Sequence, residues 1–382
     1  MTLPSVAAFT DTYFPTVNGV TYTVAGWRDR WQERGGEMPV VYPGTDEYDP
    51  GETEFPVRSL PFPFYEGFRV GVPRVPDGVG NPDIVHAHTP FGLGMSAMRL
   101  ARSRDVPLVA SYHTPTSEYA AYVSLGERVE RTVRRTATSY ERWFFDRADV
   151  VVVPSERTAE HVEDAVGIET PIAVVPNGID TDRFAPVDTD AFTARHDLPT
   201  DRPIVGYTGR HGYEKCLPDI IAATEGMDVT VVFGGDGPAR EDIEARADTA
   251  DVDVRFLGFL PRDELPGFYS ALDVFAFPSP VETQGLVALE ANACGTPVAG
   301  VNSGALKDTI EDGVNGYSYS RGDIDGFRDA IERVLSEREA LTEQCLNRRG
   351  STSVDRAVDR LAAVYADVRG GDRPVPEHLV FH

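Results

Sequence analysis

Two glutamates with a fixed spacing are the first residues that could do chemistry. Glu282 and Glu290 lie eight residues apart in FPSPVETQGLVALEANACG, which spans 277–295. A carboxylate accepts hydrogen bonds from sugar hydroxyls, and one that faces a ribose diol can accept two. The same pair could instead be a helix-capping carboxylate followed by a solvated glutamate on the helix surface. The strand, loop and helix expected around them favour a binding role.

The backbone between the two glutamates could bind an anion. The apolar run over 274–277 predicts a buried strand, and after a loop Gly285 opens a helix that continues to Cys294. Helix N-termini present N–H groups without helical partners and a positive dipole end, and Gly285 has no side chain to keep an anion away. The amides of Gly285, Leu286 and Val287 are therefore candidate ligands of a phosphate.

Two cations follow another predicted strand. Residues 204–208 form that strand, and Arg210 and Lys215 then bracket a short loop before the next helix. Arginine offers a planar fork and lysine a mobile point charge, which suits a diphosphate, although both could be surface charges without a function. Lys215 and Lys307 are the only lysines of a chain whose other basic residues are arginine. This preference for arginine favours a function for Lys215, whereas Lys307 lies in a glycine-containing turn that could merely tolerate a lysine.

The elements that position these residues follow one pattern along the chain. Short β-branched segments alternate with amphipathic ones, which predicts two doubly wound α/β units whose ligands lie beyond the carboxyl ends of the strands. The predicted strands are 5–9, 38–42, 84–86, 108–112, 150–153 and 172–175 in the first half, and 204–208, 229–233, 254–257, 274–277 and 297–300 in the second. The most clearly predicted helices are 126–147, 239–247 and 285–294.

A segment rich in proline, glycine and aspartate separates the two halves. Residues 175–203 lack a sustained hydrophobic period and predict a connector. We expect one Rossmann-like domain over 1–175 and a second over 176–350. A helical pattern returns over 351–369 and is expected to pack back on the first domain, while the tail 370–382 is polar.

The charge balance concerns the environment of the protein. The 382 residues include 36 lysines and arginines against 61 aspartates and glutamates, so the formal net charge is −25. Salt screens the repulsion within such a surface, and we expect a protein of a halophilic organism; an enzyme of ordinary cytosol is the alternative. No basic stripe is available to neutralise phosphates, which argues against nucleic acid as a partner.

Cysteine usage and hydropathy bear on the compartment. Cys216, Cys294 and Cys345 are odd in number and lack a C-x-x-C spacing, so we expect a reducing cytoplasm. The N-terminal residues lack a charged n-region, and no window approaches the length of apolar sequence that spans a membrane. We expect a cytoplasmic protein that could be peripheral on the inner membrane face.

Together the motifs resemble one enzyme family. Glu282 and Glu290 form the pattern E-x7-E, and 209–215 forms GRxxxEK. Further matches are VVPNGIDTDRF (174–184), FGGDGPAR (233–240) and FLGFLPRDELPGFYSALDVFAFPS (256–279). Their order and spacing, up to about Tyr319, are similar to the retaining glycosyltransferases of family four. The resemblance implies a GT-B fold, in which two Rossmann-like domains face a central cleft. Cys216 departs from the pattern, because glycine is usual there.

The resemblance implies roles for single residues. The residues that would bind the donor diphosphate are Gly19, Arg210, Lys215, Gly285, Leu286 and Val287, with Asn18 in support. Glu290 would bind the ribose, and Glu282 would face the donor sugar as a catalytic residue. His113, within SYHTPTSEYAAYV, matches the active-site histidine near the donor sugar, whereas His86 and His88 are expected to be structural. No cofactor is expected beyond the nucleotide-sugar co-substrate.

D-x-D triplets could be mistaken for the metal ligands of the other glycosyltransferase fold. They lie at Asp180–Asp182, Asp188–Asp190, Asp251–Asp253 and Asp323–Asp325. Aspartate is abundant enough in this chain for chance to explain them, and most fall in connectors. We therefore predict no catalytic metal.

The acceptor is the least determined part of the reaction. TDTYFPTVNGVTYTV (10–24) and DIVHAHTPFGLG (83–94) resemble the branch of diacylglycerol glucosyltransferases and glycolipid mannosyltransferases, which implies a membrane glycolipid precursor. Four arginines cluster on one predicted helix: Arg128, Arg131, Arg134 and Arg135. This helix could lie on an anionic membrane, or it could be a solvated face paired with its own glutamates.

The expected reaction moves a hexose from a UDP-glucose-like or GDP-mannose-like donor to a hydroxyl, with retention of the anomeric configuration. Three alternatives remain open at this point. One is a nucleotide-sugar epimerase of the same architecture, and another is a transferase that acts on a soluble or polyprenol-linked saccharide. The third is a protein that binds a nucleotide or glycan without turning it over.

Overall fold

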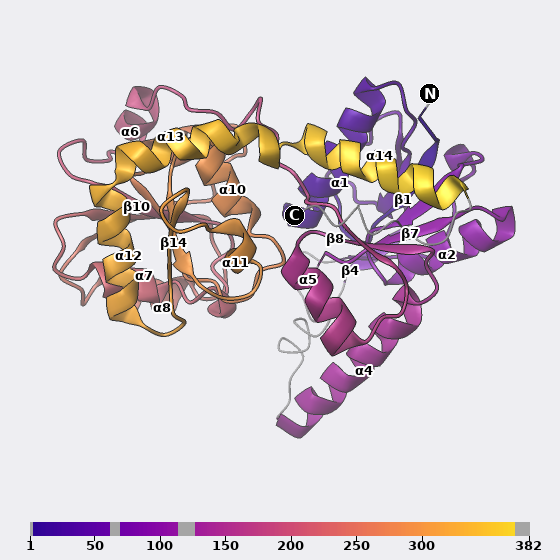
Figure 1. Cartoon of the computed structure of the whole chain (residues 1–382), viewed down its shortest axis with the longest axis horizontal. Helices are drawn as coiled ribbons and strands as arrows, with labels where there is room; N and C mark the ends of the chain where they lie inside the picture. Colours follow the sequence, from indigo (N-terminus) through magenta and orange to yellow (C-terminus); the bar gives the residue numbers. More distant parts are fainter. Residues whose placement is uncertain (1–2, 62–68, 114–126, 371–382) are drawn as a thin grey trace. The chain divides into compact units, whose positions relative to one another are not determined.

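Short runs of small and β-branched residues form two parallel sheets, one in each of two units (Figure 1). The computed structural model describes residues 3–61, 69–113 and 127–370; in the helix that begins at Glu127, side chains are described from Arg135 onward. The N-terminal unit contains the residues up to Asn177 and the final helix from Val354, and the C-terminal unit is Gly178–Ser353.

The N-terminal sheet has seven parallel strands in the order β3-β2-β1-β6-β7-β8-β9. Its strands are β1 (Val6–Phe9), β2 (Val40–Pro43), β3 (Glu54–Val57), β6 (Ile84–Ala87), β7 (Leu108–Ser111), β8 (Val150–Val153) and β9 (Ile172–Val174). The helices are α1 (Gly19–Glu33), α2 (Gly92–Arg104), α4 (Glu127–Phe145), α5 (Glu156–His161) and α14 (Val354–Gly370). A separate antiparallel pair consists of β4 (Ser59–Pro61) and β5 (Arg69–Gly71).

The C-terminal sheet has six parallel strands in the order β12-β11-β10-β13-β14-β15. Its strands are β10 (Ile204–Thr208), β11 (Thr230–Gly234), β12 (Asp253–Gly258), β13 (Val274–Phe277), β14 (Val298–Val301) and β15 (Gly316–Tyr319). The helices are α6 (Asp190–Arg195), α7 (Pro218–Thr224), α8 (Arg240–Ala247), α9 (Leu265–Ala271), α10 (Leu286–Ala293), α11 (Leu306–Thr309), α12 (Ile324–Ser336) and α13 (Arg338–Arg348).

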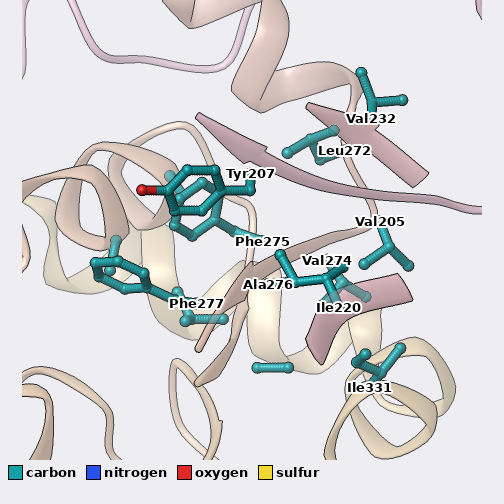
Figure 2. Close-up of a cluster of buried hydrophobic side chains, with 14 of the residues drawn as sticks. Val205, Tyr207, Ile220, Val232, Leu272, Val274, Phe275, Ala276, Phe277 and Ile331 are labelled. Atoms are coloured by element: carbon teal, nitrogen blue, oxygen red, sulfur yellow. The ribbon is translucent and has the colours of Figure 1, made fainter. Parts of the chain in front are cut away.

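The core of the C-terminal unit explains why its central strands are apolar throughout. Every residue of β10, β11 and β13 is buried, as expected for strands covered by helices on both faces. Figure 2 shows the rings of Tyr207, Phe275 and Phe277 grouped together, and the ring centroids of Tyr207 and Phe275 lie 6.0 Å apart. The hydroxyl of Tyr207 is the polar atom of this group, and it points toward the loop that follows β10, where it lies 3.4 Å from the carbonyl of Arg210.

The final helix completes the N-terminal unit. α14 lies along α1 (Figure 1), and the ring of Trp31 packs edge-on against that of Tyr365 with centroids 5.3 Å apart. Arg34, directly after α1, forms exposed ion pairs with Asp355 at 3.1 Å and Asp359 at 2.7 Å. Because exposed pairs contribute little, the attachment of α14 comes mainly from its buried apolar face, to which Tyr365 belongs.

The structure corrects three details of the sequence prediction. Residues 175–203 are not a plain connector, because the short helix α6 lies within them and packs against α9. The helix expected from Gly285 begins one residue later, at Leu286, since Gly285 has a left-handed conformation. Strands β3 and β15 were missed because half of their residues are glutamate, proline, glycine or serine, which obscures the apolar pattern of a strand.

Candidate functional site

The C-terminal unit brings the predicted lysine and the first predicted glutamate into direct contact. Lys215 follows β10 and Glu282 follows β13, which are neighbouring strands. Lys215 Nζ donates a hydrogen bond of 2.6 Å to Glu282 Oε1, and about a fifth of each side chain is exposed, at 18% and 17%. Burial on its own would lower the pKa of Lys215, but the attraction of Glu282 outweighs it and holds that pKa above its ordinary value. The ammonium group of Lys215 therefore stays protonated at neutral pH.

Arg210 lies at the start of the same loop. Its side chain is 39% exposed, and its guanidinium pairs with Glu214 Oε1 at 2.5 Å. The loop rests on the turn that follows β11: the amide of His211 donates to the carbonyl of Asp236 at 2.8 Å, and a Cβ on Gly235 would lie 2.0 Å from the carbonyl oxygen of Gly209. The motifs GRHGYEK and FGGDGPAR thus pack backbone against backbone, which only glycine permits at this distance.

One position at which this chain departs from the family pattern, Cys216, has an unusual backbone conformation. Cys216 has φ 52°, in the left-handed region that favours glycine. It ends the short 3-10 turn formed by 213–215, just before α7. The glycine that is usual at this position is therefore explained by a turn, and Cys216 makes the same turn with a side chain.

The start of α10 presents backbone amides next to this pair of charges. Gly285 has φ 78°, and a Cβ there would lie 2.7 Å from Leu306 Cδ2 and 3.1 Å from Phe277 Cε1. The left-handed conformation therefore favours glycine at this position, and a Cβ would require the Leu306 side chain to shift. The first amides of α10, including those of Leu286 and Val287, have no partner within the helix and lie at its positive dipole end.

The second predicted glutamate is held from two sides. Glu290 is 6% exposed on α10, where Tyr269 Oη donates to Oε2 at 2.8 Å and Arg262 Nη1 lies 3.5 Å from Oε1. Burial raises the pKa of Glu290, while Arg262 and the Tyr269 hydrogen bond act in the opposite direction. The guanidinium of Arg262 also lies over the ring of Phe184, 5.1 Å from its centroid. Neither Arg262 nor Tyr269 was predicted as a site residue, although both lie in a motif that the sequence analysis singled out.

The N-terminal unit carries the remaining predicted residues. Asn18 precedes α1, and its Oδ1 accepts from the amide of Thr21 at 2.9 Å while its Nδ2 donates to Thr12 Oγ1 at 2.7 Å. Gly19 is the first residue of α1 and is exposed. The asparagine therefore fixes the loop that leads into the helix, and the exposed helix start at Gly19 is accessible to an anion.

His113 belongs to a buried group of imidazoles. It lies two residues beyond β7 and is 8% exposed, and its Nε2 is 3.1 Å from Nδ1 of His88, one residue beyond β6. Burial lowers the pKa of His113 to about 4, so its ring is neutral at physiological pH. His88, expected to be structural, is thus a direct neighbour of the predicted active-site histidine.

A buried carboxyl group that contacts Thr89, the residue after His88, was not predicted. Asp11 follows β1, is 2% exposed, and accepts from Thr89 Oγ1 at 2.7 Å and from the amide of Leu93 at 3.1 Å. Burial raises the pKa of Asp11 to about 6, and these hydrogen bonds limit the rise. Asp11 binds the first turn of α2, which is a stabilising place for a carboxylate and accounts for its burial.

The predicted arginine cluster lies mostly outside the described side chains. The backbone of α4 is helical from Glu127, as expected, but of Arg128, Arg131, Arg134 and Arg135 only Arg135 has a described side chain, and it is exposed. None of the helices in the described ranges is both long and apolar enough to cross a membrane. Within the same ranges no three His, Cys, Asp or Glu side chains gather as they do at a metal site, and metal independence stays a prediction.

Comparisons with known proteins follow the two units. A model described as "Glycosyltransferase Family 4" matches residues 17–183, and one described as "Glycosyl transferases group 1" matches 188–348. A GDP-mannose-dependent alpha-mannosyltransferase of Mycolicibacterium smegmatis is 30% identical over 343 residues, which are 87% of this chain and 88% of the relative. An alpha-monoglucosyldiacylglycerol synthase of Streptococcus pneumoniae is 27% identical over 337 residues, 82% of this chain and 75% of the relative.

A solved structure shares the fold. The sucrose-phosphate synthase of Thermosynechococcus elongatus superposes with a TM-score of 0.79 over 96% of this chain and 100% of that chain, at 21% sequence identity. Such a likeness concerns the arrangement of the elements alone, and it agrees with the two parallel sheets described above. The chain belongs to the family-four glycosyltransferases and has their GT-B fold.

Proposed function

We propose that this glycosyltransferase moves a hexose from a nucleoside diphosphate sugar to a hydroxyl group with retention of configuration and without a metal. The observation that carries the proposal is the Lys215–Glu282 contact of 2.6 Å. The loop of Lys215 also carries a second cation, Arg210, and the loop of Glu282 leads into the amide-bearing start of α10. Eight residues further along the chain, the carboxylate of Glu290 is oriented by Tyr269 and Arg262 and is suited to accept hydrogen bonds from a ribose diol. Together these groups match the parts of a nucleotide-sugar donor.

The proposed chemistry follows from these charges. When the bond between the anomeric carbon and the diphosphate oxygen breaks, its electron pair stays on the diphosphate, where Lys215, Arg210 and the α10 amides stabilise the negative charge. The acceptor oxygen bonds to the same face of the anomeric carbon and its proton passes to the departing phosphate. Glu282, fixed by Lys215, orients the sugar through its second oxygen. His113 is neutral, and we assign it to positioning of the donor sugar.

The donor is proposed to be UDP-glucose-like or GDP-mannose-like, and the mannosyltransferase relative, whose name specifies GDP-mannose, supports the second. Thermal shifts with UDP-, GDP- and ADP-sugars would identify the base. NMR of the best donor, alone and with acceptor, then tests the reaction: transfer requires both substrates and leaves the anomeric coupling unchanged. Donor consumption without acceptor would indicate an epimerase, and binding without turnover would overturn the enzymatic proposal. Loss of transfer in EDTA, restored by a divalent cation, would contradict metal independence.

The acceptor is proposed to be a membrane glycolipid precursor, reached by a protein that binds the inner face of the membrane from the cytoplasm. The relative named as a monoglucosyldiacylglycerol synthase supports a lipid hydroxyl, and the arginines of α4 suit an anionic surface. Sedimentation with phosphatidylglycerol vesicles tests this. Binding should weaken as salt rises and be lost in R128Q/R131Q/R135Q, but persist in the matched triple variant R99Q/R102Q/R104Q on α2. Equal binding by the two variants would remove α4 as the membrane contact.

The net charge of −25 supports a further proposal, that the protein works in high salt. Repulsion between unpaired surface carboxylates is screened within a Debye length, which falls from about 10 Å at about 0.1 M salt to about 3 Å at about 1 M. The melting temperature should therefore rise with KCl over this range. A melting temperature that is unchanged or falls would indicate that the acidic surface is not an adaptation to salt.

A further inference from the structure

Three imidazoles form one stack in the N-terminal unit. His86 lies in β6, His88 just beyond it and His113 just beyond the neighbouring strand β7, and their exposures are 0%, 2% and 8%. The rings of His86 and His88 are stacked with centroids 4.0 Å apart, and those of His88 and His113 with centroids 5.4 Å apart at an interplanar angle of 14°. The ring of Trp27 lies within 6.2 Å of all three.

The outer and middle rings have different partners. His86 uses both nitrogens on the fold: Nδ1 contacts the hydroxyl of Tyr365 at 2.6 Å and Nε2 that of Ser111 at 2.8 Å. His88 directs Nδ1 at Nε2 of His113, 3.1 Å away. His86 therefore ties α14 to the sheet, whereas the polar contact of His88 is made to the residue assigned to the donor sugar.

The charge state of the stack restricts what this contact can be. Burial lowers the pKa of His86, His88 and His113, and a charge on a neighbouring imidazole would lower the pKa of His86 and His88 further. At neutral pH all three rings are neutral, so the contact between His88 and His113 holds a single proton, with one ring donating and the other accepting. Whichever ring donates, the proton at this contact decides whether Nδ1 of His113 is a donor or an acceptor.

We propose that His88 is a positioning residue for His113: it fixes the plane of the His113 ring and the nitrogen that carries its proton. This inference rests on the proposed function insofar as His113 meets the donor sugar. A neutral imidazole has one donor and one acceptor, and a sugar hydroxyl that meets the wrong one loses its hydrogen bond. Without His88 the ring would populate both tautomers and more than one orientation.

The test compares variants at two positions of equal burial. H88F keeps an aromatic ring in the stack but removes the nitrogen, and H88N keeps a polar atom close to the position of Nδ1. We expect kcat of H88F to fall by about 10- to 100-fold, the cost of a misplaced reacting group, with the affinity for UDP or GDP unchanged. H88N should recover most of kcat. H86F is the matched control, and its kcat should stay within about threefold of wild type below its melting temperature, because both ring nitrogens of His86 bond to Tyr365 and Ser111.

A second readout does not depend on activity. NMR of protein labelled with 15N-histidine reports which ring nitrogen of His113 is protonated, and one tautomer is expected in wild type and H88N but a mixture in H88F. If H88F does not fold, H88A replaces it. An unchanged tautomer in the variant, or a loss of kcat in H86F equal to that in H88F, would overturn the proposal. If the wild type transfers no sugar, the proposed function fails, yet the NMR comparison still decides the role of His88.

Discussion

The two units of the molecule solve the problem of a shielded ionisable group in opposite ways. In the C-terminal unit Lys215 is shielded on most of its surface but lies 2.6 Å from the carboxylate of Glu282, and its pKa is raised. In the N-terminal unit His113 is buried more deeply, its polar partner is another imidazole, and its pKa falls to about 4. Desolvation lowers the pKa of both groups. The attraction of Glu282 outweighs it at Lys215, whereas at His113, whose partner is an uncharged imidazole, desolvation decides the pKa.

This difference separates two tasks. A permanent cation stabilises a diphosphate in the ground state and better still as it departs, so it belongs where the donor phosphates are proposed to lie. A neutral imidazole offers one donor and one acceptor and no charge, which suits the orientation of a sugar hydroxyl. The comparison makes the proposed C-terminal site sensitive to loss of charge and the proposed N-terminal site sensitive to gain of charge.

The largest expected effect is the loss of the cation. K215M removes the ammonium group and leaves Glu282 without its partner, so kcat with the best donor should fall by about 1,000-fold, as for removal of a group that stabilises charge in the transition state. The control is K307M, which removes the other lysine from an exposed position and should leave kcat within about twofold. Circular dichroism establishes that both variants are folded. If K215M is folded and keeps the wild-type kcat, the proposal that this loop binds the donor diphosphate is wrong. The role assigned to a charged Lys215 in the comparison of the two units would be wrong as well.

A smaller effect, on the free energy of unfolding, is expected from protonation of the neutral His113. The unfolded chain protonates His113 near pH 6.5 and the folded protein only near about 4, so protons favour unfolding as the pH falls between these values. The stability contributed by a neutral His113 is present above pH 6.5 and is lost toward pH 4, with about 2 kcal/mol lost by pH 5. Asp11, whose pKa is raised to about 6, acts in the opposite direction over the same range. The prediction is therefore a difference between two proteins.

In H113Q this loss is absent while the contribution of Asp11 remains. Urea unfolding of wild type and H113Q at pH 8 and pH 5 measures it: the stability advantage of wild type should shrink by about 2 kcal/mol at the lower pH. An advantage that is the same at both values would mean that His113 protonates normally in the folded protein. The contrast between the two units would then be wrong in its claim that burial keeps His113 neutral.

The sequence predicted the architecture and most of the residues on the loops, for a physical reason. Alternation of buried strands with helices is visible in the pattern, and parallel strands bring the residues that follow them to one edge of the sheet. Lys215 and Glu282 meet because they follow neighbouring strands. Their direct contact could not be predicted, because it depends on which side chains cross between two loops.

Partners that act on a site residue from another element were also beyond the sequence. Tyr269 precedes Glu290 by 21 residues, and His88 precedes His113 by 25, and neither spacing has a local signature. Without the neighbouring strands in place, His88 looked like any buried histidine. The left-handed turn at Gly285 could have been anticipated from the glycine, but the close approach of the Leu306 side chain could not.

The smallest expected effect concerns Glu290, a carboxylate on which both burial and a counter-charge act. Burial raises the pKa of Glu290 and Arg262 opposes the rise, so in R262Q the carboxyl group should protonate at a higher pH than in wild type. Because only the carboxylate accepts from both ribose hydroxyls, the affinity of R262Q for UDP or GDP should fall by about threefold at pH 8 and about tenfold at pH 6. The hydroxyl of Tyr269 and the thiol of Cys294 also face Glu290, and both stay protonated over this range because their pKa values are raised.

Calorimetric titration of R262Q against wild type at both pH values measures the effect, and R262K, which keeps the charge, should recover most of it. R333Q is the control, since Arg333 likewise lies over an aromatic ring, that of Tyr317, but on α12. Loss of the contact between Arg262 and Phe184 would weaken nucleotide binding equally at pH 8 and pH 6. If the ratio of wild-type to R262Q affinity does not change with pH, Arg262 therefore acts through packing. A ratio that grows as the pH falls would place Glu290 with Lys215, as an ionised group that depends on its counter-charge.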